Sequence, residues 1–181
     1  MDVFLLKLDF VLILIEIFLF LTIVYYSSHS ILSVYRGGGN KLNEIETSIF
    51  ITSLLVLIFH TITSYLSSKI SGLDTDTDTI TIRIYFYSFL VLAETLWFLS
   101  VISIHRVSNC HITKISRLCL YLSPLLILTQ SLRGVERVFY DTNELLYWYK
   151  FVVTFSNIST VTLLSLYPLY KIIGLIEFNE A

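Results

Sequence analysis

Long hydrophobic runs alternate with short polar segments along this chain. A membrane-spanning α-helix needs about 20 apolar residues, whereas an outer-membrane β-strand alternates apolar and polar positions over about ten. The continuous runs therefore predict an all-α integral membrane protein, with a single transmembrane helical domain over residues 1–181. The predicted spans are residues 10–26, 49–66, 82–104, 115–132 and 151–170.

The fourth run leaves the number of spans open. It is short and contains Pro124 and Gln130, and a proline inside a helix removes a backbone hydrogen bond. This segment either crosses the membrane or lies in it as a re-entrant or interfacial helix. We therefore predict a bundle of four to five transmembrane helices.

Residues that favour helix ends lie outside the hydrophobic runs. Gly134 is predicted to end the fourth helix, because glycine readily adopts the left-handed conformation found there. Asp141 and Glu144 have the spacing of a capping box and are predicted to begin the fifth helix. Such signals lengthen several helices to roughly 45 Å, whereas the hydrocarbon core is only about 30 Å thick. Several helices should extend beyond the bilayer.

The composition supports a membrane protein without chemistry of its own. Charged residues make up 14% of the chain, against roughly 25% in soluble domains. The net charge of −2 argues against direct nucleic-acid binding, which needs a basic face. Hydrolase and phosphate-binding motifs are absent from the sequence, and Cys110 and Cys119 have neither zinc nor disulfide-framework spacing. We predict a protein that is not an enzyme and has no catalytic residues, metal site or cofactor.

Four side chains inside the hydrophobic runs are candidates for a functional role: Glu16, His60, Tyr87 and Glu94. A charge at the bilayer centre costs about 2.5–3.5 kcal/mol on insertion scales, so each group should face the bundle interior. They could form a proton or ion pathway, or a buried switch whose protonation favours one of two packings. Alternatively, Glu94 stays neutral and hydrogen-bonds to a Tyr, Ser or Thr of a neighbouring helix.

A compact basic loop, residues 105–117, lies between the third and fourth runs. Lys and Arg are equally numerous on the two sides of the predicted bundle, so the positive-inside rule does not orient it. The basic loop is our reason to place its side, and with it the C-terminus, in the cytoplasm. The residues predicted to dock a partner are Arg36, Lys41, Arg106, His111, Lys114 and Arg117.

These features predict an oligomeric membrane sensor or anchor subunit. It would couple a change at the membrane to a soluble cytoplasmic protein, because the chain has too little soluble mass to act alone. One alternative is a small proton or cation channel or carrier that uses the intramembrane Glu and His residues. Another is an immunity-type protein that blocks a membrane toxin by helix packing.

Four general features describe the whole chain: its length, its number of spans, its Ile-, Ser- and Thr-rich composition and its lack of catalytic motifs. In these respects it resembles the small multi-span membrane component of the Kiwa anti-phage system (KwaA-type). The resemblance implies a homo-oligomer in the bacterial inner membrane. Such a protein would sense membrane perturbation during infection and engage a cytoplasmic effector in antiviral defence.

Overall fold

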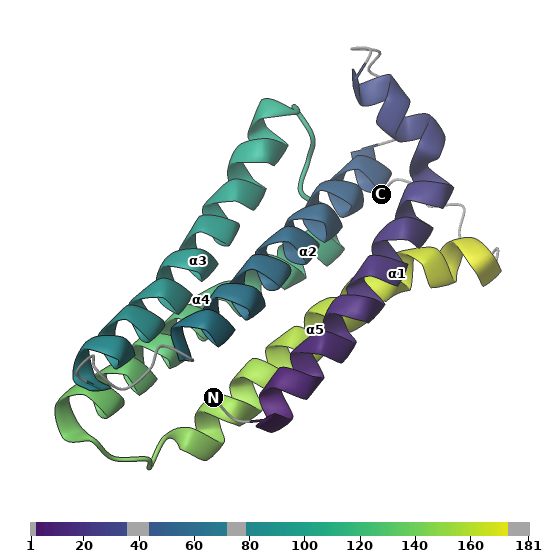
Figure 1. The fold of residues 1–181 in the computed structure, drawn as a ribbon. Helices are drawn as coiled ribbons and strands as arrows, with labels where there is room; N and C mark the ends of the chain where they lie inside the picture. Colours follow the sequence, from purple (N-terminus) through teal and green to yellow (C-terminus); the bar gives the residue numbers. More distant parts are fainter. Residues whose placement is uncertain (1–2, 36–43, 72–78, 174–181) are drawn as a thin grey trace.

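Five long helices run alternately up and down in a computed structural model that describes residues 3–35, 44–71 and 79–173 (Figure 1). No β-strand occurs among these residues. All five helices are long and apolar enough to cross a membrane, which confirms the predicted all-α, multi-pass membrane fold. The helices are α1 (Val3–Tyr35), α2 (Glu44–Ser71), α3 (Thr79–Val107), α4 (Lys114–Val135) and α5 (Leu146–Ile173), and α4 continues as a π-helical turn, η2 (Glu136–Tyr140).

The fourth hydrophobic run is a full member of the bundle. It lies within α4, which contains Pro124, and α4 with η2 forms an apolar segment of 27 residues. The longest helix, α1, has 33 residues, or about 50 Å at 1.5 Å per residue. This length exceeds the about 30 Å hydrocarbon core, as predicted for several helices.

The helices form a closed ring. Each packs against its neighbours in the chain, and α5 packs against α1 (Figure 1). We call the end where α1, α3 and α5 begin end A, and the end where α2 and α4 begin end B. Helix α2 also reaches across the ring to α4 and α5.

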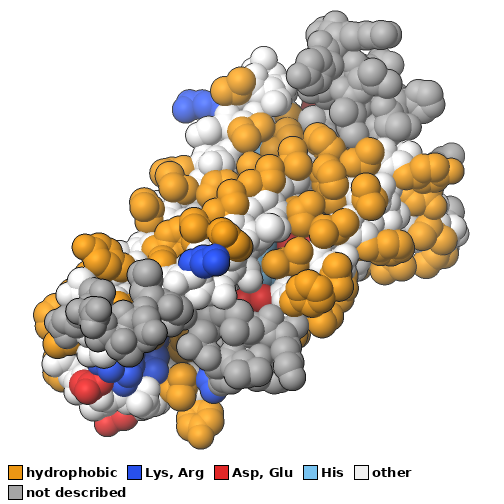
Figure 2. All heavy atoms as spheres, in the orientation of Figure 1, with side chains coloured by type: hydrophobic (Ala, Val, Ile, Leu, Met, Phe, Trp, Pro, Cys, Tyr) orange, Lys and Arg blue, Asp and Glu red, His pale blue; other side chains and the backbone are white. Residues whose placement is uncertain are grey.

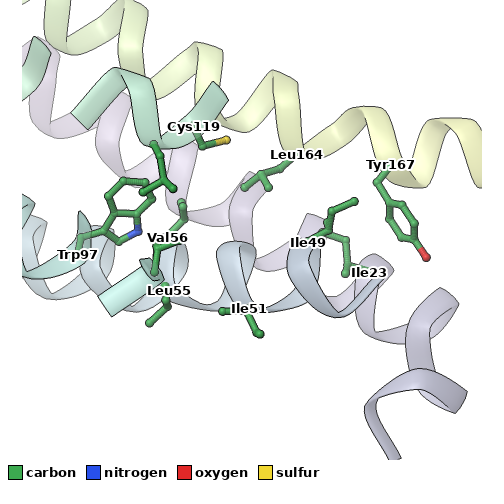
Figure 3. Packing of buried hydrophobic residues seen from close by; sticks show 11 residues of the cluster. Ile23, Ile49, Ile51, Leu55, Val56, Trp97, Cys119, Leu164 and Tyr167 are labelled. Carbon is green, nitrogen blue, oxygen red and sulfur yellow. The ribbon is translucent and has the colours of Figure 1, made fainter. Parts of the chain in front are cut away.

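An apolar core fills the half of the ring toward end B (Figure 3). Its side chains come from all five helices, and Ile23, Ile49 and Val101 are fully buried. The cluster consists of Ile23, Ile49, Ile51, Leu55, Val56, Trp97, Val101, Cys119, Leu120, Leu164 and Tyr167. The outer surface is also hydrophobic, as expected for helices that contact lipid, and a small area of acidic and histidine atoms interrupts it on the face shown in Figure 2.

A buried hydroxyl network joins α2, α3 and α4 near end B. His105 is 1% exposed, and its Nδ1 lies 2.7 Å from the carbonyl oxygen of Val101. Because a carbonyl oxygen only accepts, Nδ1 carries a proton, and in the neutral ring Nε2 accepts from the Ser48 hydroxyl at 2.9 Å. Thr113 is the N-cap of α4, and its side chain accepts from the Ser116 backbone N–H. End B is therefore closed by side-chain hydrogen bonds as well as by apolar packing.

Gly134 does not end the fourth helix, contrary to the prediction. It lies inside α4, where an added Cβ would come within 2.9 Å of the Tyr87 Cβ. The missing side chain therefore serves the close approach of α4 to α3. The helical backbone continues through η2, and the left-handed residue is Asp141, with φ of 50°.

The predicted capping box at Asp141 and Glu144 is also wrong as the start of the fifth helix, because α5 begins at Leu146. The Asp141 carboxylate instead pairs with the guanidinium groups of Arg83 (2.7 Å) and Arg137 (3.2 Å). It therefore joins the start of α3 to η2.

Candidate functional site: a polar cavity inside the helix ring

A cavity of about 270 Å³ lies inside the ring, on the side of the apolar core that faces end A. Every helix contributes to its wall, and polar side chains project from each of them. Trp97 and Cys119 belong both to the wall and to the core. The charged residues of the wall are Asp9, Glu16, His60, Glu94, Arg133 and Lys150.

A carboxylate–imidazole pair joins α1 to α2 in this wall. Glu16 Oε1 lies 2.7 Å from His60 Nδ1, and the two side chains are 5% and 15% exposed. The other ring nitrogen, His60 Nε2, lies 3.9 Å from Asp9 Oδ1. The imidazole is therefore held between two carboxylates, both of them on α1.

Glu94 bonds to a different helix but lines the same cavity. It accepts a hydrogen bond of 2.7 Å from the Ser123 hydroxyl, which joins α3 to α4. This contact is the one expected if Glu94 only stabilises packing. Its carboxylate nevertheless lies in the same wall as Glu16 and His60, as the switch and pathway interpretations require.

Tyr87 lies nearer end A than Glu94 and also lines the cavity. Its ring meets the ring of Tyr149 edge-on, with 6.5 Å between centroids, and its Cβ packs against Gly134. All four intramembrane residues singled out from the sequence therefore share one wall.

The sequence analysis did not single out Arg133, which is 3% exposed and lines the cavity near end A. Its guanidinium forms an ion pair with Glu136 and donates to Asn143 Oδ1 at 2.8 Å. Glu136 also accepts from the Leu145 N–H at 2.9 Å and from the Thr142 hydroxyl at 3.2 Å. The spacing of three residues between Arg133 and Glu136 was the available signal, since such pairs face each other on a helix.

Several polar atoms of the wall are buried without a hydrogen-bond partner in the described part of the chain. Buried polar groups in proteins are paired in the large majority of cases. Unpaired atoms around a cavity therefore indicate that water or a ligand completes their bonding. The atoms are Glu16 Oε2, His60 Nε2, Trp97 Nε1, Gln130 Oε1 and Arg133 Nε.

The predicted partner-docking residues lie elsewhere, at end B. Arg106, His111, Lys114 and Arg117 are all exposed around the α3–α4 connection, whereas Arg36 and Lys41 lie outside the described residues. End B thus has an exposed basic surface that is separated from the cavity by the apolar core.

Cys110 lies on this connection, and its thiol donates to the carbonyl oxygen of Glu44 at 3.2 Å. Burial, together with the negative charge of Glu44, raises the thiol pKa to about 11. Only about one thiol in a thousand is then ionised at pH 8. We expect the iodoacetamide reaction rate to rise about tenfold per pH unit up to pH 11, and Glu44→Gln to speed the reaction at pH 8. Cys119→Ser would be the background, and a rate that levels off near pH 9 would contradict this assignment.

No protein-family model, curated protein or solved structure matches this chain. The resemblance to the Kiwa membrane component therefore stays a prediction. The described residues also contain no group of three or more His, Cys, Asp or Glu side chains that could hold a metal ion. Functional assignment accordingly depends on the geometry of the cavity and of end B.

Proposed function

We propose that this protein is a membrane sensor in which the Glu16–His60 pair is a protonation-sensitive switch. The observation that carries the proposal is the position of the pair, which is buried between two helices in the hollow half of the ring. Imidazole is the side chain whose ordinary pKa lies within the range of pH that cells experience. The ion pair is lost when His60 gives up its proton.

Loss of the pair would weaken the contact between α1 and α2, because the two side chains join these helices. Helix α1 packs mainly against α2 and α5, and its side chains from Phe10 to Tyr25 include many exposed apolar groups that need only lipid around them. The cavity provides room next to α1 in which side chains can move. A change in the charge of one pair can therefore favour one of two helix packings.

The signal would leave the membrane at end B. We propose that Arg106, His111, Lys114 and Arg117 dock a soluble cytoplasmic protein, which places end B and the C-terminus in the cytoplasm. The assembly would be a homo-oligomer in the bacterial inner membrane, and its role in anti-phage defence is what the Kiwa resemblance implies. Four exposed cationic or titratable side chains around the α3–α4 connection support this part of the proposal.

Sensing fits the cavity better than conduction does. A proton or cation channel needs a polar path across the whole bundle. Here the cavity ends against the apolar core. Trp97 lies at the boundary, and Val101 and Leu164 fill the ring beyond it. Conduction would require this core to open, whereas a switch needs only a local change around Glu16.

The switch can be tested through Trp97, which lines the cavity and is 6% exposed. Trp148→Phe removes the other tryptophan, which is 54% exposed, and leaves Trp97 as the only indole emitter. In lipid nanodiscs we expect its emission to change along a sigmoidal curve between pH 4 and pH 10, because a charge in the wall of the same cavity changes. Glu16→Gln should flatten this curve, and the exposed Glu144→Gln should leave it unchanged.

An identical titration in the parent and in Glu16→Gln would overturn the switch. Reconstituted liposomes give an independent measurement. We expect no proton or cation flux from the folded protein, and a flux that Glu94→Gln abolishes would favour conduction instead.

The docking surface has its own test. When the protein is expressed together with the products of its neighbouring genes, it should retain a soluble partner during purification in detergent. Reversing the charges of Arg106, Lys114 and Arg117 to Glu should remove that partner, because complementary charges fix the register of such an interface. Neutralising Lys69, near the far end of α2, is the matched control. Retention of the partner by the triple variant would show that end B is not the docking surface.

A further inference from the structure

We propose that the cavity binds a protonated aliphatic amine, with Glu16 and Glu94 as its main recognition groups. The inference rests on the proposed function in one respect, that the cavity is the sensory site. It proposes that the protein senses a ligand of this chemical class in addition to protons.

The charges of the wall favour a cation. Three carboxylates, from Asp9, Glu16 and Glu94, line the cavity together with the basic side chains of His60, Arg133 and Lys150. Because Glu136 neutralises Arg133, the wall has one more negative than positive charge. Glu16 is paired with His60, but Glu94 has only the hydroxyl of Ser123 and makes no ion pair within the described ranges. Arg133 offers little compensation, because it is paired with Glu136, which lies outside the cavity wall.

The unpartnered acceptors favour a cation that carries N–H donors. Glu16 and Gln130 are 5% and 7% exposed, and Glu16 Oε2 and Gln130 Oε1 have no hydrogen-bond donor among the described residues. Each would gain a charge-assisted hydrogen bond from an ammonium group, a stronger bond than one between neutral groups. A quaternary ammonium ion or an inorganic cation has no such donor.

The shape and lining of the cavity favour an organic ligand over a metal ion. The acidic groups do not converge into a metal-binding cluster in the part of the chain that the structure describes. Phe59, Phe86 and Trp97 line the wall, and aromatic faces attract organic cations as well as alkyl chains. A volume of about 270 Å³ is far more than a single ion needs, since about 10–15 Å³ already holds one water.

The spacing of the carboxylates further favours a diamine over a monoamine. Asp9 and Glu16 of α1 lie on either side of the His60 imidazole, whereas Glu94 projects from α3. A short diamine can bring one ammonium group to Glu94 and the other to the carboxylates of α1. A monoamine can satisfy only one of these positions.

Isothermal titration of the full-length protein in nanodiscs tests the inference, with 1,4-diaminobutane, butylamine and 1,4-butanediol as probes. We expect the diamine to bind more tightly than the monoamine, and the uncharged diol not to bind. Glu16→Gln and Glu94→Gln should each weaken diamine binding at least tenfold. Glu94→Asp should retain most of the affinity, and Glu144→Gln should retain all of it. Circular dichroism would verify that each variant is folded.

The result that overturns the inference is the absence of amine binding, or equal affinity in the parent, Glu16→Gln and Glu94→Gln. Its failure can be told apart from failure of the proposed function. If Trp97 reports a pH transition that depends on Glu16 while no amine binds, the switch stands and the ligand class falls. If the diamine binds while the Trp97 titration is unaffected by Glu16→Gln, the ligand class stands and the switch falls.

Discussion

Replacing His60 with leucine is expected to lower the free energy of unfolding by about 3–5 kcal/mol. The substitution leaves the Glu16 carboxylate 5% exposed and without the imidazole that lies 2.7 Å from it. Glu16 Oε2 already has no hydrogen-bond partner among the described residues, so the isolated carboxylate would be buried almost without compensation. Equilibrium unfolding in mixed detergent, followed by circular dichroism, measures the change.

The double variant Glu16→Leu/His60→Leu separates the loss of the pair from general damage to packing. Apolar replacements for both partners of a buried ion pair are often neutral or stabilising. We therefore expect the double variant to be close to the parent in stability, although each single variant is destabilised. Strictly additive losses would show that the two side chains do not interact. The same double variant should also lack the pH response of Trp97, because its switch is gone.

Replacing Glu136 with alanine is expected to cost about 3 kcal/mol, the low end of the range for a broken buried pair, because Glu136 lies at the end of the bundle. Its carboxylate holds Arg133, the Thr142 hydroxyl and the Leu145 N–H together. Without it, the 3%-exposed guanidinium of Arg133 loses its counter-charge, and the connection between η2 and α5 loses its central acceptor.

Glu144→Ala is the matched control for Glu136, since it removes an exposed carboxylate from the same connection. We expect its effect to stay within about 0.5 kcal/mol, as for most surface substitutions. Hydrogen exchange should show the loss in Glu136→Ala first at residues 141–146. A loss of protection confined to end B, or a cost no larger than that of Glu144→Ala, would contradict the role given to Glu136.

The helices themselves could be predicted from the sequence, because long apolar runs are a local property and lipid leaves few other ways to satisfy the backbone. Each predicted span lies inside one of the five helices. The ends were less well predicted. Gly134 is a packing contact with Tyr87, and Asp141 ends η2 and binds Arg83. Glycine and aspartate have several structural uses, and the surrounding helices decide among them.

The sequence by itself also determined which side chains had to turn inward, since Glu16, His60, Tyr87 and Glu94 are expensive to expose to lipid. Only the tertiary structure decided their partners. Glu16 meets His60, Glu94 meets Ser123, and the closed ring brings all four residues to one cavity. It also decided that Arg133 belongs to this wall and that His105 is buried at end B. The physical reason is that inward direction follows from the polarity of one helix, whereas partners depend on which faces of different helices pack together.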